Sequence, residues 1–454
     1  MKSASIVLLV AVLGLAAPLR ADMPASPFKP DGQPDPHYMV PDELTLPYAL
    51  SFALDNSFAI RQAKERIRQQ EGILLEVRSS QIPNVSGSAG YSDTTQQMAA
   101  GTGDERSWSL NITARQTLFS AGGVTASVEA QRLALESATL SLQSVIDAVM
   151  LDVRTKFYLV LVTRERIKVQ EQNVELLRRQ LQDVKNRYEA GTVSNFEVLR
   201  AEVAVANAQP PLITARNAYR LAIDDLRQAL GFVTADAANV GKIPEFVGKL
   251  EFAPVSYELA SALSTAKERR PDLQRLRKLE QSAEKSVAAR RANLYPNLAA
   301  YASYDWRKRP GYSDFAASRD GITVGLSSTW NIFDGSATRA RVKQAESALE
   351  QTRLTAAEAE LSISVEVRRA LSSLQEATEL AEASKKVIEQ AEEAVRLADA
   401  RYSAGTATQL DVLQARTDLT TARLNQLQAF YSFNVASAAV RRAMGLPDEL
   451  VAGR

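Results

Sequence analysis

Two carboxylates hold matching positions in a stretch that this chain contains twice. Glu197 follows Gly191 by six residues, and Asp411 follows Gly405 by six residues. Each lies in the first turn of a predicted helix, where the helix dipole favours negative charge, so a solvated helix-terminal charge is the simplest interpretation. The chain contains no cysteine and a single histidine, His37. These residues supply almost no material for acid–base, thiol or metal chemistry, and we predict neither an enzyme nor a cofactor.

The repeated stretch is Arg187–Ala201, which returns as Arg401–Ala415 with eight of fifteen positions identical. A repeat of this kind indicates two versions of one structural unit. In each version a glycine follows a very long helical pattern and precedes a shorter one. We expect Gly191 and Gly405 to adopt the left-handed conformation that ends a helix.

The following residues also match between the two versions. Ser194 and Thr408 are expected to cap the second helix of each pair. Each pair of helices is therefore predicted to form a hairpin that turns at a Gly-Thr sequence.

We predict six segments along the chain. They are a signal peptide (1–21), a Pro-rich arm (22–44), a first repeat (45–233), a joining segment (234–256), a second repeat (257–446) and a C-terminal tail (447–454). The first segment has one cation, Lys2, before an apolar run, which is typical of a signal peptide, with a retained anchor as the alternative. No later apolar run approaches the ~18 residues of a membrane-spanning helix. A net charge of +1 argues against a nucleic-acid partner.

Helical periodicity covers most of the chain. It begins near Leu46, pauses at 56–58, and later continues over 121–190 and 336–404 with hardly a break. Shorter helices are expected after each turn, ending near Gly231 and Gly445. The pair Pro210-Pro211 should interrupt the first of them with a kink.

Four short segments alternate with period two and predict strands at about 84–97, 106–118, 298–306 and 320–332. One face of these strands is apolar. Its members are Trp108, Leu110, Ile112, Ile322, Val324, Leu326 and Trp330. Aromatic residues gather at the strand ends, as in the girdles of membrane β-barrels, so we expect this face to contact lipid. Two hairpins packed on a soluble core are the alternative.

Four strands cannot close a barrel, since the smallest single-chain barrels need about eight. Open sheet edges cannot face lipid, because their unpaired N–H and C=O groups are costly there. If the strands lie in a membrane, several chains must share one barrel, and two or three copies would provide enough strands.

The R-Y-x-A-G-T turn followed by D/E-V-L, present twice, and the Pro-Asn pairs Pro83-Asn84 and Pro296-Asn297 resemble the TolC-like outer-membrane efflux family. The resemblance covers about 44–446. It implies a mainly α fold with a small membrane β part: a homotrimer with a 12-stranded β-barrel continued by a 12-helix α-barrel. It also implies a passive exit duct of a tripartite efflux or type I secretion system. Its partners would be a periplasmic adaptor and an inner-membrane pump of the RND, ABC or MFS type.

The resemblance also implies roles for the turn residues. Asp411 would face the lumen at the periplasmic mouth, and Glu197 and Tyr402 would link helices that close it. Ala407 stands where some relatives have a gating arginine, and Gln414 where some have a second carboxylate, so this mouth would carry fewer charges. The expected adaptor contacts are Gly191, Thr192, Ser194, Gly405, Thr406 and Thr408.

Two other classes of protein remain as alternatives. A periplasmic adaptor or long-helical scaffold would also be exported, although two hairpins and amphipathic strand pairs argue against it. An enzyme is disfavoured by the poverty of catalytic residues. The transported cargo and the class of pump are left open by the sequence.

Overall fold

The computed structural model describes residues 42–94, 106–232, 244–309, 314–448 and 450. The chain divides into two compact units, and the larger one, 44–231 with 246–454, contains the described helices and the four-stranded sheet. The expected signal peptide, most of the Pro-rich arm and residues 234–243 of the joining segment lie outside the described residues. Two short strands, β1 (Glu43–Thr45) and β4 (Glu245–Val247), pair with each other.

Each repeat begins with a pair of helices that are separated by a sharp break. In the first repeat these are α2 (Leu46–Asn56) and α3 (Phe58–Arg78), and in the second α8 (Leu259–Arg269) and α9 (Pro271–Ala292). A short 3-10 turn, η3 (Ser79–Gln81), follows α3. The pause in periodicity at 56–58 therefore marks a real helix boundary.

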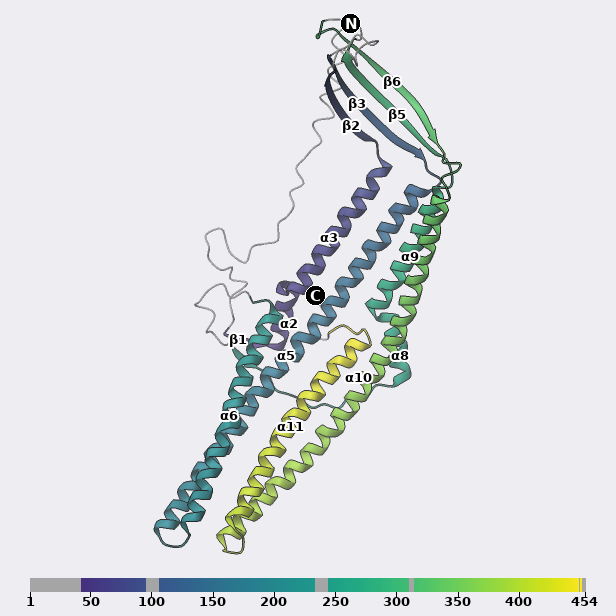
Figure 1. The fold of residues 1–454 in the computed structure, drawn as a ribbon. Helices are drawn as coiled ribbons and strands as arrows, with labels where there is room; N and C mark the ends of the chain where they lie inside the picture. The colour runs from purple at the N-terminus through teal and green to yellow at the C-terminus, as the bar shows by residue number, and fades with distance from the viewer. Residues whose placement is uncertain (1–41, 95–105, 233–243, 310–313, 449, 451–454) are drawn as a thin grey trace. The chain divides into compact units, whose positions relative to one another are not determined.

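Each repeat also contains a long helical hairpin, as Figure 1 shows. The long members are α5 (Gly123–Glu189) and α10 (Ala337–Ser403), and the returning members are α6 (Asn195–Leu230) and α11 (Gln409–Ala443). Both long helices have 67 residues, which corresponds to about 100 Å of helix. Among the described residues, no helix combines the length and apolar composition that crossing a membrane requires.

Helix α6 runs without a break through Pro210 and Pro211, so the predicted interruption of the helix is wrong, and the kink expected there stays a prediction. Packing explains the continuity, because Ala208 and Leu212 on either side of the proline pair are buried against Val174 and Leu177 of α5. Tertiary contacts thus outweigh the local cost of proline in a helix.

One antiparallel sheet joins the two repeats. Its strands are β2 (Asn84–Asp93), β3 (Arg106–Phe119), β5 (Asn297–Lys308) and β6 (Ser318–Thr329), in the order β2-β3-β5-β6. The pairing of β3 with β5 connects the repeats, and β2 and β6 are left as edges. Trp330 follows the end of β6, so its predicted place within a strand is wrong; its indole N–H donates to the Leu294 carbonyl at 3.1 Å.

A glycine follows the last helix of each repeat and packs against the break between the first two helices of that repeat. Gly231 and Gly445 have φ of +75° and +68°. A Cβ at Gly231 would lie 2.6 Å from the Asn56 carbonyl oxygen, and a Cβ at Gly445 would lie 2.9 Å from the Arg270 nitrogen. Only glycine satisfies both the backbone conformation and this close approach.

Candidate functional site

The two hairpin turns have the same backbone geometry. Gly191 and Gly405 have φ of +70° and +74°, as their sequence context predicts. The N–H groups of Thr192 and Thr406 donate to the carbonyls of Arg187 and Arg401, both at 2.9 Å. This is the Schellman pattern of a helix C-terminus. The threonine hydroxyls donate to the same two carbonyls, at 2.9 and 3.1 Å, which explains the repeated Gly-Thr pair.

The helices that follow the turns begin differently. At the start of α11, the Thr408 N–H and hydroxyl both donate to Oδ2 of Asp411 at 2.8 Å, and the two residues form a capping box. These hydrogen bonds from the backbone and the side chain of Thr408 hold the pKa of Asp411 below its ordinary value. Ser194 precedes α6 at the matching position but makes no side-chain capping bond. Glu197 Oε2 is buried without a hydrogen-bond partner among the described residues.

Asp411 belongs to an exposed polar stripe on α11. Gln414 and Asp418 are also exposed and follow Asp411 by three and seven residues, so the three side chains share one helix face. The Gln414 amide donates to Asp418 at 2.9 Å. Asp418 was missed by the sequence analysis, although its seven-residue spacing from Asp411 could have revealed it.

A polar seam joins the two hairpins along α5. Four residues of α5 at seven-residue spacing, from Arg166 to Arg187, each contact the second hairpin. The pairs are Arg166 with Gln428, Asn173 with Thr420 (3.4 Å), Gln180 with Arg416 (3.0 Å) and Arg187 with Tyr402. Arg416 also donates to Asp399 at 3.1 Å, which ties the seam to α10.

Tyr402 lies at the end of this seam nearest the turns. The Arg187 guanidinium stacks over its ring at 5.0 Å from the centroid, a cation–π contact between the hairpins. Within one chain, Arg187 contacts Tyr402. Among the described residues, Glu197 Oε2 has no hydrogen-bond partner, so no hydrogen bond joins it to Tyr402. The predicted helix link through Glu197 therefore remains a prediction.

The register of the sheet separates an apolar face from a polar one. Leu110 pairs with Ala89 and Trp306, whereas the neighbouring Asn111 pairs with Ser88 and Asp305. The apolar face is widely exposed. Its most exposed side chains are Ile322 (75%), Val324 (75%) and Leu326 (67%).

Aromatic contacts occur at the end of the sheet that is remote from the helices. Trp108 and Trp306 meet edge to face at 5.2 Å, and the Trp108 indole donates to the Phe315 carbonyl at 3.0 Å. Phe315 lies between β5 and β6, so this hydrogen bond attaches the β5–β6 connection to the start of β3.

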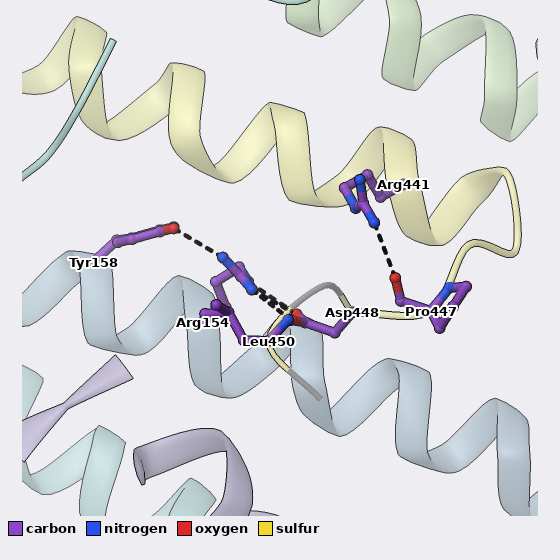
Figure 2. Close-up of polar contacts among 6 residues, drawn as sticks. All are labelled: Arg154, Tyr158, Arg441, Pro447, Asp448 and Leu450. Atoms are coloured by element: carbon purple, nitrogen blue, oxygen red, sulfur yellow. Dashed lines mark hydrogen bonds and ion pairs between the residues drawn. The ribbon is translucent and has the colours of Figure 1, made fainter. Parts of the chain in front are cut away.

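The chain end after α11 folds back on α5. Figure 2 shows Arg154 of α5 paired with Asp448 and reaching Tyr158. The two Arg154–Asp448 contacts from Nη2 are 2.6 and 2.7 Å, and both side chains are largely buried. Arg441 donates to the Pro447 carbonyl at 3.1 Å. Such a buried, bidentate pair fixes the end of α11 onto the long helix of the first repeat.

A second buried network links the helix break of the second repeat to its neighbours. Arg270, 6% exposed, donates to Glu366 at 2.7 Å and Asp272 at 2.8 Å. Ser144 donates to the same Asp272 carboxylate. Burial alone would raise the pKa of Asp272, but the hydrogen bonds from Ser144 and Arg270 outweigh it and lower the pKa. The described residues contain no group of histidines, cysteines or acids that could hold a metal ion.

Comparison with known proteins agrees with this architecture. The family model for outer membrane efflux proteins matches residues 49–232 and 262–446. Protein CyaE of Bordetella pertussis is 26% identical over 410 residues, covering 90% of this chain and 85% of CyaE. The cobalt-zinc-cadmium resistance protein CzcC of Cupriavidus metallidurans is 25% identical, covering 88% and 90%. The CmeC outer membrane channel of Campylobacter jejuni superimposes with a TM-score of 0.76 at 16% identity, covering 88% and 85%.

An amphipathic sheet that joins two repeats of long helical hairpins is the fold of TolC-like outer-membrane channels. The chain belongs to the outer membrane efflux protein family. Its function is that of an outer-membrane exit channel.

Proposed function

We propose that three copies of this chain form one passive exit duct, a 12-stranded β-barrel in the outer membrane continued by a 12-helix α-barrel. The observation that carries this proposal is the four-stranded sheet, which has an exposed apolar face and two open edges, β2 and β6. Unpaired edge groups in lipid cost several kcal/mol each. Pairing β6 of each copy with β2 of the next removes every edge, and three copies of four strands give the twelve.

In this proposal most of the duct lies outside the membrane. About 100 Å of helix is far longer than the roughly 30 Å hydrocarbon core of a bilayer, so the hairpins extend into the periplasm. The family match to 49–232 and 262–446 supports two repeats at 45–233 and 257–446, joined by 234–256. A signal peptide at 1–21 directs export, and the duct acts as a channel, not as an enzyme.

We assign the hairpin turns to the contact with a periplasmic adaptor, which couples the duct to an inner-membrane pump. Gly191, Thr192, Gly405 and Thr406 are exposed, and both turns present the same rigid backbone. Ser194 and Thr408 border this surface. A matching pair of turns in each of three copies gives an adaptor six similar docking points.

The stripe of Asp411, Gln414 and Asp418 lines the periplasmic mouth in this proposal. Three-fold symmetry brings three copies of each carboxylate around one axis, where they attract cations. The capping box fixes the direction of the Asp411 carboxylate, so its charge stays at the mouth. The hydrogen bonds from Thr408 lower the pKa of Asp411 in each chain, which favours the charged carboxylate.

Closure of the mouth depends on contacts between hairpins. The polar seam along α5 and the Arg187–Tyr402 contact hold the two hairpins of one chain together. Two groups of buried polar atoms lie at the starts of α6 and α11 and have no hydrogen-bond partner among the residues that the structure describes. They are Glu197 Oε2 and the amide of Gln409. Buried polar groups are nearly always hydrogen-bonded, so a neighbouring copy is a natural source of their partners.

Single-channel recording in planar bilayers tests the proposal. Wild-type trimers should conduct, prefer cations and be blocked by a trivalent cation added at the helix side. Asp411→Asn should weaken selectivity and relieve block, because it removes three charges from one ring while its amide oxygen can still accept from Thr408. The matched control is Thr408→Val, which removes the capping hydroxyl and keeps the carboxylate. A protein without conductance would contradict the duct, and unchanged selectivity in Asp411→Asn would contradict the lumenal position of this helix face.

A further inference from the structure

The polar face of the sheet carries four charged side chains among the described strands. They are Arg115, Asp305, Arg307 and Arg319. Three are cationic and one is anionic, so the face has an excess of two positive charges in each chain. The polar face is therefore basic, in contrast to the acidic stripe on α11.

Two of these arginines oppose each other directly. Arg307 of β5 and Arg319 of β6 are register partners, and both are exposed. On the other side, Arg307 pairs with Ser109 of β3, which is neutral. Like charges directly opposite each other destabilise an antiparallel pair. Neither guanidinium group makes a hydrogen bond or ion pair in the part of the chain that the structure describes.

The one acid on this face, among the described strands, makes no ion pair with either arginine. Asp305 accepts hydrogen bonds from Asn111 at 2.7 Å and from Ser303 at 3.3 Å, both neutral donors. The guanidinium groups of Arg307 and Arg319 thus remain available to a ligand.

The pair lies at the end of the sheet that is remote from the helices. Arg307 is next to the last residue of β5, which enters from α9, and Arg319 is the second residue of β6, which leads to α10. In the proposed trimer this end is the outer mouth of the barrel.

We propose that the Arg307–Arg319 pairs of three copies form a ring at the outer mouth that binds multivalent oxyanions within the lumen. This inference rests on the proposed trimeric duct. Guanidinium groups donate two parallel N–H bonds to phosphate or carboxylate oxygens, so closely spaced arginines fit such ligands better than monovalent anions. The duct would then be acidic at its entrance and basic at its exit.

Sided addition of inorganic tripolyphosphate to single channels in a bilayer tests this proposal. We expect block from the strand side and much weaker block from the helix side. Arg307→Ser and Arg319→Ser should each raise the half-blocking concentration about tenfold, equivalent to about 1.4 kcal/mol shared by three symmetric sites. Arg307→Lys, which keeps the charge, should retain most of the block.

The matched control is Arg106→Ser. Arg106 lies at the same end of the sheet but on the apolar face, opposite Asp93, so its loss should leave block unchanged. Relief by Arg106→Ser alone would assign the anion to the membrane surface and overturn the proposal. Conducting wild-type channels without strand-side block would also overturn it. Channels that do not conduct would instead contradict the duct itself.

Discussion

Replacement of Gly231 by alanine should loosen the break between α2 and α3. The new side chain would occupy a backbone with φ of +75°, which costs an L-residue about 1–2 kcal/mol. Its Cβ would also lie 2.6 Å from the Asn56 carbonyl oxygen and 3.1 Å from the carbonyl carbon. Backbone atoms cannot rotate away, so overpacking adds roughly 1–3 kcal/mol.

Gly405→Ala is the matched control. Gly405 has a similar φ of +74°, but a Cβ there would meet nothing within 4 Å. The control therefore has the conformational cost without the collision. The Thr406 N–H, which donates to the Arg401 carbonyl at 2.9 Å, reports in that variant how far the conformational cost alone speeds exchange.

Hydrogen exchange measures this difference locally and does not require reversible unfolding of the whole protein. The Ser57 N–H donates to Ala53 at 2.9 Å, and the Arg61 N–H donates to Ser57 at 3.0 Å, so both amides report on the break. An added cost of about 2 kcal/mol should speed their exchange about 30-fold in Gly231→Ala. Unchanged protection of both amides in a folded Gly231→Ala protein would refute the packing argument.

Three further outcomes are expected. Leu110→Arg and Val324→Arg should each prevent assembly in the outer membrane, at about 2–4 kcal/mol near the bilayer midplane, and normal trimer yield on extraction would contradict the lipid-facing assignment. Gly405→Val should lower export while inserted protein stays at its normal level, because a β-branched residue is strained at positive φ far from the sheet; wild-type efflux would argue against a role for this turn. Asp272→Asn should lower thermal stability at neutral pH, and this deficit should shrink as the pH falls from 3.8 through the lowered pKa of Asp272 in the folded protein, because protonation then removes the charge that Ser144 and Arg270 stabilise; a pH-independent deficit would exclude the charge as its cause.

Local sequence patterns were sufficient to predict the helices and strands whose apolar residues recur at regular spacing. The break at 56–58, the two 67-residue helices and the period-two strands all follow from the spacing of apolar residues. The left-handed turns at Gly191 and Gly405 follow from residue type, because glycine populates positive φ at little cost.

What the sequence did not reveal depends on contacts between distant segments. The helix through Pro210 and Pro211 is held by burial against α5, which local propensity does not include. The seam partner of Arg187 could not be chosen from spacing alone, because two helices from different repeats meet there. The pairing of Arg307 with Arg319 likewise required the sheet register.

The number of chains in the assembled particle tests the central claim most directly. Native mass spectrometry of the detergent-extracted protein should give the mass of three mature chains, because one copy supplies four of the twelve strands of the proposed barrel and leaves two open edges. A stable single-chain particle extracted from the outer membrane would contradict the shared barrel, and with it the duct.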